Sequence, residues 1–229
     1  MTSPRYSTVL FDLDHTLLDS DASHAVAFDT TMQSIGVEPT SDAFNVFDRL
    51  NQALWRRVEA GDIGPNDVRV LRFEQLTAEL GVRADPVEMG ETFVQGLTDH
   101  GELYAGGLEL LERLSGVVRI GMVTNGIGSV QRGRIERLGI GRHFDAVAIS
   151  GELGVSKPDP RIFDIVLSEL GVESRDSVVM VGDSLSSDIA GAVNASIDSI
   201  WFDPGQTSAD ALEPTHRVMN LADVLDLVL

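Results

Sequence analysis

The sequence of 229 residues contains no cysteine. Disulfide bonds, thiolate metal sites and cysteine nucleophiles are therefore excluded. It also has no apolar run of membrane-spanning length, and its short polar N-terminus lacks the basic and apolar segments of a signal peptide. With ordinary hydrophobic (43%) and charged (23%) fractions, these absences predict a cytoplasmic globular protein that has no membrane partner.

Positive charge is scarce. The chain has 36 acidic and 17 basic residues, and its formal net charge is -19. Binding a nucleic-acid polymer requires clustered Lys and Arg, so such a partner is not expected. A small phosphorylated substrate remains compatible, because a bound divalent cation reverses the local field. Lys157 is the single lysine, which raises the question of whether chemistry requires it there.

Short apolar runs alternate with helix-length patterns along most of the chain. The first run, residues 7–11, ends at Asp12 and is typical of a strand buried on both faces. The other predicted strands are residues 117–123, 146–149, 178–181 and 199–202, and the predicted helices between them are residues 126–138, 160–170 and 184–195. This alternation predicts an α/β fold with a parallel sheet.

Residues 19–99 interrupt the alternation. Apolar residues recur there only at helical spacing, in four segments separated by Gly36, residues 61–65 and residues 81–86. Four amphipathic helices between the first two strands predict an inserted helical cap. The core would then consist of residues 1–18 and 100–229.

Polar residues follow the predicted strands, where ligands bind in open α/β sheets. These residues are Asp12 and Asp14, then Thr124, Asn125 and Gly126, then Lys157, and finally Asp183 with Asp188 one helical turn later. Phosphoryl transfer can use a carboxylate as nucleophile, further carboxylates as Mg²⁺ ligands, and a second carboxyl as general acid and base. A hydroxyl, an ammonium and helix-start N–H groups can hold the phosphate oxygens. Each piece alone is common, but their order and placement together indicate this chemistry.

These segments resemble, in order, the four motifs of the haloacid dehalogenase superfamily. The motifs are Asp-x-Asp-x-Thr at residues 12–16, the strand-end Thr124, Lys-Pro at residues 157–158 and Gly-Asp-x-x-x-x-Asp at residues 182–188. The resemblance covers essentially the whole chain. It implies a Rossmann-like core with a four-helix cap of the superfamily's first type, which closes over the site and excludes water. The single lysine occupies the motif position, where a compact ammonium fits better than a planar guanidinium.

The resemblance also implies a role for each motif residue. Asp12 would be the nucleophile and a Mg²⁺ ligand, and Asp14 the general acid/base with its backbone carbonyl on the metal. Asp183 would bind Mg²⁺ directly, while Asp188 would support it through water or by positioning Lys157. The residues that would hold the phosphoryl group are Thr124, Asn125, Gly126 and Lys157.

Asp14 favours phosphate chemistry over dehalogenation, because attack on carbon needs no acid two residues after the nucleophile. A sugar-phosphate or phosphoglycolate-type phosphatase, or a phosphomutase, would share every catalytic residue. A non-catalytic binding module would have lost Asp12 or Asp14, and neither is lost. The resemblance thus implies a Mg²⁺-dependent hydrolase of small phosphomonoesters, monomeric or homodimeric.

Residues 54–63 and 70–73 of the predicted cap resemble the superfamily's pyrimidine 5′-nucleotidases, as do residues 124–126 and 182–204. The resemblance implies a nucleoside 5′-monophosphate substrate, whose base and sugar an aromatic residue and an arginine of the cap could hold. The alternative is that Trp55 and Phe73 pack between helices, and that Arg56, Arg57 and Arg72 form a solvated face. The scattered histidines are interpreted as surface or structural residues: His15, His24, His100, His143 and His216.

Overall fold

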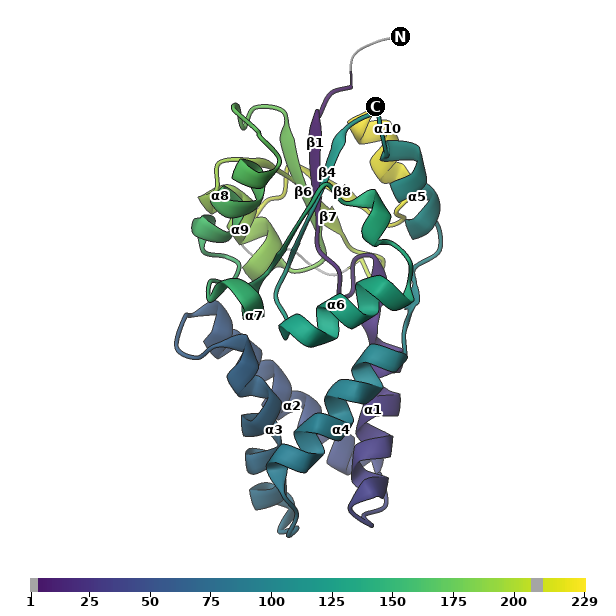
Figure 1. Ribbon diagram of the computed structural model, residues 1–229, viewed down its shortest axis with the longest axis vertical. Helices are drawn as coiled ribbons and strands as arrows, with labels where there is room; N and C mark the ends of the chain where they lie inside the picture. Colours follow the sequence, from purple (N-terminus) through teal and green to yellow (C-terminus); the bar gives the residue numbers. More distant parts are fainter. Residues whose placement is uncertain (1–3, 207–211) are drawn as a thin grey trace.

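The computed structural model describes residues 4–206 and 212–229. At its centre lies a six-stranded parallel sheet in the order β5-β4-β1-β6-β7-β8 (Figure 1). Its strands are β1 (Thr8–Phe11), β4 (Arg119–Thr124), β5 (Ala146–Ile149), β6 (Val178–Gly182), β7 (Asp198–Phe202) and β8 (His216–Val218). The α/β fold with a parallel sheet that the sequence predicts is confirmed.

Helices cover both faces of this sheet. Successive side chains of β1 alternate between the two resulting cores: Val9 and Phe11 belong to one, and Leu10 belongs to the other. Because both faces are covered, the strand is buried along its whole length and is apolar except for Thr8. The covering helices are α8 (Pro160–Glu169) and α9 (Ala190–Asn194) on one side, and α5 (Gly107–Leu114) and α10 (Asp223–Val228) on the other (Figure 1).

Four further helices form a separate layer beyond one end of the sheet, here called the helical block (Figure 1). They are α1 (Ser20–Ser34), α2 (Ser41–Glu59), α3 (Pro65–Leu80) and α4 (Pro86–Asp99). They occupy the stretch in which the sequence predicts four helices. In sequence they lie between β1 and β4, so the chain leaves the sheet after its first strand and returns before its second.

Aromatic side chains build the interior of the helical block. Phe47 lies 5.1 Å from Phe93 and 5.8 Å from Phe73, measured between ring centroids, and all three rings are buried. Phe73 therefore packs between helices, which is one of the two interpretations that the sequence left open for this residue. Two residues from outside the block, Ile127 and Val130, pack into the same cluster. Val130 lies on α6 (Gly128–Arg137), which crosses between the block and the sheet (Figure 1).

Several short elements are absent from the sequence prediction. Residues 184–195, predicted as one helix, begin with a π-helical turn, Leu185–Ile189, before α9. The strands β2 (Leu18–Asp19) and β3 (Glu102–Leu103) pair antiparallel where the chain enters and leaves the helical block. The other missed elements are short and are not marked by a continuous apolar run: β8, α5, α7 (Ser150–Leu153), α10 and the 3₁₀ turn Gly141–His143.

None of the described helices combines the length and the apolar character needed to cross a bilayer.

The contact between α1 and α4 depends on Gly96. A Cβ atom at this position would lie 2.8 Å from both Cα and Cβ of Ala27, closer than packed atoms tolerate. In an open helix Gly→Ala stabilises by up to about 1 kcal/mol. Here we expect Gly96→Ala to lower the free energy of unfolding by about 1–3 kcal/mol, because α1 must move. Urea denaturation would measure this, with Glu91→Ala on the exposed face of α4 as the control. A stabilised Gly96→Ala protein would contradict the close approach.

Candidate active site

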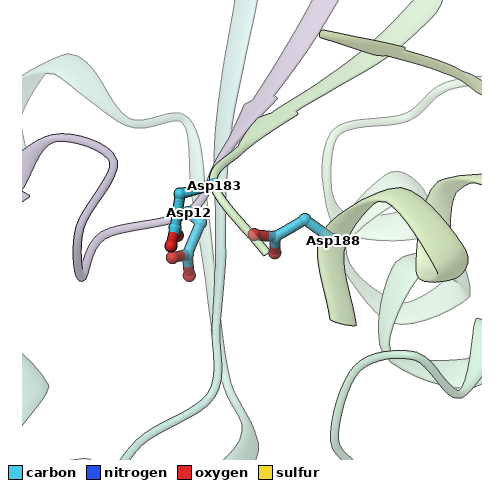
Figure 2. A group of neighbouring side chains, drawn as sticks. All are labelled: Asp12, Asp183 and Asp188. Atoms are coloured by element: carbon cyan, nitrogen blue, oxygen red, sulfur yellow. The ribbon is translucent and has the colours of Figure 1, made fainter. Parts of the chain in front are cut away.

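Three carboxylates meet at the carboxyl end of the sheet. Asp12 follows β1 and Asp183 follows β6, and these two strands are hydrogen-bonded neighbours. Figure 2 shows the two side chains together, with Asp188 pointing toward them from the helical segment after β6. One oxygen from each carboxylate lies within 4.8 Å of the others. The structure thus brings together three of the acidic residues that the sequence places at strand ends.

Gly182 allows this convergence. A Cβ atom at Gly182 would lie 2.3 Å from Cγ of Asp188, so a side chain there would displace the carboxylate. Asp188 is fully buried, and its Oδ2 accepts a hydrogen bond from the backbone N–H of Ser184 at 3.0 Å. The glycine and the second aspartate of this motif therefore depend on each other.

Lys157 lies at the centre of the carboxylates. Its Nζ donates to Oδ1 of Asp12 at 2.6 Å, to Oδ1 of Asp188 at 2.7 Å and to the carbonyl of Val123 at 2.7 Å. These three acceptors use all three ammonium protons. Burial acts to lower the pKa of Lys157, but the two carboxylates outweigh it and raise the pKa above its usual range. The buried lysine is therefore charged.

The cluster contains three carboxyl groups but only one ammonium group. Burial raises the pKa of Asp12 well above its usual value, and the neighbouring carboxylates add to this while Lys157 opposes it. Burial and the charge of Asp188 likewise raise the pKa of Asp183 to about 7. Convergent carboxylate oxygens with one cation among them are a donor set that fits a hard divalent ion such as Mg²⁺.

Asp14 lines the same cavity as Asp12 and Asp183, and its carboxylate contacts three donors. Its carboxylate accepts hydrogen bonds from Nη1 of Arg134 at 2.6 Å, from the Ser20 hydroxyl at 2.5 Å and from Nε2 of Gln131 at 2.7 Å. Burial acts to raise the pKa of Asp14, but Arg134 and the hydrogen bonds hold it below its usual range. Asp14 is therefore a carboxylate in this arrangement.

Gln131 and Arg134, both on α6, were missed by the sequence analysis. Gln131 also donates to Oγ1 of Thr124 at 2.7 Å, so one amide joins Thr124 to Asp14. Their spacing of three residues places them on one face of the helix. This spacing was the only feature of the sequence that could have identified them as site residues. Polar residues on helices are usually solvated, yet both of these are almost completely buried.

Arg134 connects the site to the helical block. Its Nε donates to the carbonyl of Leu97 on α4 at 2.9 Å, and its Nη2 donates to the Ser23 hydroxyl on α1 at 3.1 Å. The same guanidinium binds Asp14. One side chain thus holds α1, α4 and the loop after β1 in a fixed relation.

Asn125 and Gly126, predicted to contact phosphate, bind protein groups in this structure. The Asn125 amide donates to the carbonyl of Lys157 and accepts from its backbone N–H, both at 2.9 Å. The N–H of Gly126 donates to the Ser150 hydroxyl at 3.0 Å. These contacts fix the loop that carries Lys157.

A cavity of about 210 Å³ separates the strand ends from the helical block. Trp55 and Arg72 line it from the block, whereas Arg56 and Arg57 are exposed. The prediction that the cap arginines form a solvated face is therefore correct for Arg56 and Arg57. It is wrong for Arg72, which is 1% exposed.

Two histidines also line this cavity, although all five were predicted to be surface or structural residues. His15 lies in the loop after β1, between Asp14 and Thr16, and adopts a left-handed backbone conformation (φ 58°). Nδ1 of His24 lies 2.8 Å from the carbonyl of Ser20, which can only accept, so Nδ1 carries a proton. Burial lowers the pKa of His24 to about 4, so this ring is neutral near pH 7. The three other histidines are not among the residues that line the cavity.

The structure has an α/β fold in which acidic residues and a lysine meet at the carboxyl ends of the parallel strands. Comparison with known proteins identifies the class to which it belongs. A sequence profile of the haloacid dehalogenase-like hydrolases matches residues 6–196. The chain is 32% identical over 225 residues to the pyrimidine 5′-nucleotidase PynA of Streptococcus pneumoniae, covering 96% of this chain and 94% of PynA. It is 30% identical over 225 residues to the pyrimidine 5′-nucleotidase YjjG of Escherichia coli, covering 98% of each.

A solved structure is similar over the same extent. The HAD-hydrolase YfnB of Bacillus subtilis, bound to magnesium, superposes with a TM-score of 0.89 at 28% identity, covering 97% of this chain and 98% of YfnB. The chain therefore belongs to the haloacid dehalogenase-like hydrolase family. Family membership and the phosphatases among its relatives indicate an enzyme that hydrolyses phosphoric monoesters.

The contacts of Arg134 generate a prediction. Arg134→Met removes the charged donor to Asp14 and both links to the helical block, so we expect kcat on p-nitrophenyl phosphate to fall roughly 10–100-fold through misplacement of Asp14. Arg132→Met, which removes an exposed arginine of the same helix, should leave kcat within twofold. Circular dichroism would verify folding, and Arg134→Lys gives a second variant that keeps the charge. A folded Arg134→Met enzyme with normal kcat would show that these contacts are dispensable.

Proposed function

We propose that this chain is a Mg²⁺-dependent phosphatase that transfers the phosphoryl group of a pyrimidine nucleoside 5′-monophosphate to Asp12 and then to water. The observation that carries the proposal is the convergence of Asp12, Asp183 and Asp188 around Lys157 at the strand ends. This convergence combines a nucleophile, metal-ligand oxygens and a fixed positive charge within one site.

Asp12 has one carboxylate oxygen free for attack. Lys157 holds Oδ1, and no hydrogen-bond donor in the described parts of the chain contacts Oδ2. Oδ2 would attack phosphorus, and Lys157 would stabilise the negative charge of the phosphoryl group and of Asp12. Thr124 contributes a hydroxyl: because its Oγ1 already accepts a hydrogen bond from Gln131, its own proton is available to a phosphoryl oxygen.

Asp14 would act on both halves of the reaction. It would protonate the leaving oxygen in the first step and take a proton from water in the second. The carboxylate form present here is the one that the second step needs. The first step needs the protonated form of Asp14, and Arg134 opposes protonation because it lowers the pKa of Asp14. Substrate binding would therefore have to weaken the contact between Arg134 and Asp14.

Mg²⁺ would be held by Asp12, Asp183 and the backbone carbonyl of Asp14, where it would neutralise charge on the phosphoryl oxygens. Asp188 would support this site through its contact with Lys157. These carboxylates come from adjacent strand ends, so the core fixes the site without help from the helical block.

Two observations support a pyrimidine nucleotide as substrate. Trp55 and Arg72 line the cavity from the helical block, where an aromatic ring and a guanidinium could hold a base. The relatives PynA and YjjG are named pyrimidine 5′-nucleotidases. The helical block, residues 19–99, would act as the cap that selects the substrate, and residues 1–18 and 100–229 would form the catalytic core.

Sugar-phosphate and phosphoglycolate-type phosphatases, and phosphomutases, would use the same core residues. The cytoplasmic location and the monomeric or homodimeric state expected from the sequence remain predictions.

A substrate screen with Mg²⁺ tests both parts of the proposal. We expect kcat/KM for UMP, CMP and dUMP to exceed that for AMP, GMP and glucose 6-phosphate at least tenfold, because a pocket that encloses a single ring would reject a purine sterically. Asp12→Asn should abolish turnover of every substrate while the protein stays folded. A flat substrate profile would remove the nucleotide assignment, and normal turnover by Asp12→Asn would remove the mechanism.

Metal removal gives a separate prediction. Excess chelator should abolish activity and Mg²⁺ should restore it, whereas Ca²⁺ should inhibit because it accepts more oxygen ligands in a less fixed geometry. Asp183→Asn should raise the Mg²⁺ concentration needed for half-maximal activity more than Asp176→Asn, which alters an exposed acid before the same strand. Full activity in chelator would refute the metal requirement.

A further inference from the structure

Arg72 on α3 is a buried arginine that the proposed reaction does not use. It is 1% exposed, and its Nε donates to the carbonyl of Val68, one turn earlier in the helix, at 2.9 Å. Its guanidinium carbon lies 4.9 Å from the centre of the Phe93 ring. The side chain is therefore held in place from two sides.

The guanidinium lacks an acidic partner among residues 4–206 and 212–229. Its two terminal nitrogens donate to no group in that part of the chain, and Arg72 takes part in none of the ion pairs found there. The other buried cations at this cavity, Arg134 and Lys157, each bind carboxylates. Burial alone lowers the pKa of Arg72 to about 9, so the group is charged near pH 7. A buried, unpaired charge is costly to the fold, and a ligand would offset that cost.

The position of Arg72 identifies which part of a substrate it faces. It lines the cavity from the helical block, whereas Asp12 and Lys157 line it from the sheet. Burial is the only cause that shifts its pKa, so no catalytic carboxylate acts on it at close range. Its charge does act on His24, which lies beside it in the cavity. Arg72 therefore faces the leaving group of the substrate rather than the phosphate.

We propose that Arg72 determines specificity by binding the carbonyl oxygen at position 2 of a pyrimidine base, an inference that rests on the proposed nucleotidase function. A guanidinium only donates hydrogen bonds, so its ligand must present an acceptor. The position-2 carbonyl is shared by uracil, cytosine and thymine. In a purine nucleotide the ring nitrogen N3, rather than a carbonyl oxygen, lies at the corresponding position. One donor group can thus bind every pyrimidine through the same carbonyl, which a sugar phosphate lacks.

A carboxylate on the substrate would also accept from a guanidinium. The cavity argues against that ligand because Glu59, a half-buried acid, lines the same space. Burial raises the pKa of Glu59, and the charge of Asp188 adds to this. A second anion would increase the repulsion at Glu59, whereas a neutral carbonyl would not. Trp55, on the same wall, provides an apolar surface for a flat ring.

The test compares two substrates with and without Arg72. UMP carries the position-2 carbonyl, while the 5′-phosphate of a phenyl C-nucleoside keeps the phosphate, the ribose and a six-membered ring without any carbonyl. We expect Arg72→Met to lower kcat/KM for UMP roughly 10–100-fold, as loss of hydrogen bonds to a charged group does, and to leave the phenyl analogue within about threefold. Arg57→Met, an exposed arginine of the same block, should change neither.

Unfolding of the same variants separates recognition from a structural role. Replacing an unpaired buried charge with an apolar side chain should leave Tm equal or higher. If Arg72→Met lowered kcat/KM equally for UMP and the phenyl analogue, or lowered Tm by several degrees, the proposed role of Arg72 would be overturned. A loss for phosphoglycolate but not for UMP would overturn the carbonyl and assign a carboxylate instead. Wild-type enzyme inactive on every nucleotide would overturn the proposed function itself, so the two failures are distinguishable.

Discussion

The contact of Lys157 with Asp12 and Asp188 is the interaction on which the rest of the site depends. Three carboxylates at adjacent strand ends repel one another, and one buried ammonium in contact with two of them makes the arrangement tenable. The Asn125 amide fixes the lysine from the backbone side. A guanidinium could not replace it, because three acceptors surround a single nitrogen atom.

The helix α6 joins this site to the helical block. Its inner face carries Gln131 and Arg134 to Asp14, while Val130 packs into the aromatic cluster of the block. Because Arg134 also binds Leu97 and a hydroxyl on α1, any rotation of the block relative to the sheet must alter the contacts of Asp14. The position of the block and the hydrogen bonds of Asp14 are thereby linked.

Some of this architecture follows from sequence pattern alone. Buried parallel strands are mostly apolar because helices cover both faces, so β1, β5, β6 and β7 were identified nearly to the residue. The start of β4 was placed two residues too early, because Val117 and Val118 extend the apolar run before the strand, and several of the short helices and strands were missed altogether. The four helices of residues 19–99 were recognisable because apolar residues recur there at helical spacing between Gly- and Pro-containing breaks.

The sequence by itself determined that Asp12, Lys157 and Asp183 follow strands and must meet at one sheet edge, because parallel strands present their carboxyl ends together. Only the tertiary structure decided the partners of the arginines. Arg57, Arg72 and Arg134 have the same side chain, and the sequence does not distinguish them. Arg57 is exposed, Arg72 is buried without an acidic partner in the described part of the chain, and Arg134 is buried in an ion pair with Asp14. Helical periodicity reports which side of a helix is buried, but the contact across the interface comes from a segment distant in sequence, and no local pattern encodes that pairing.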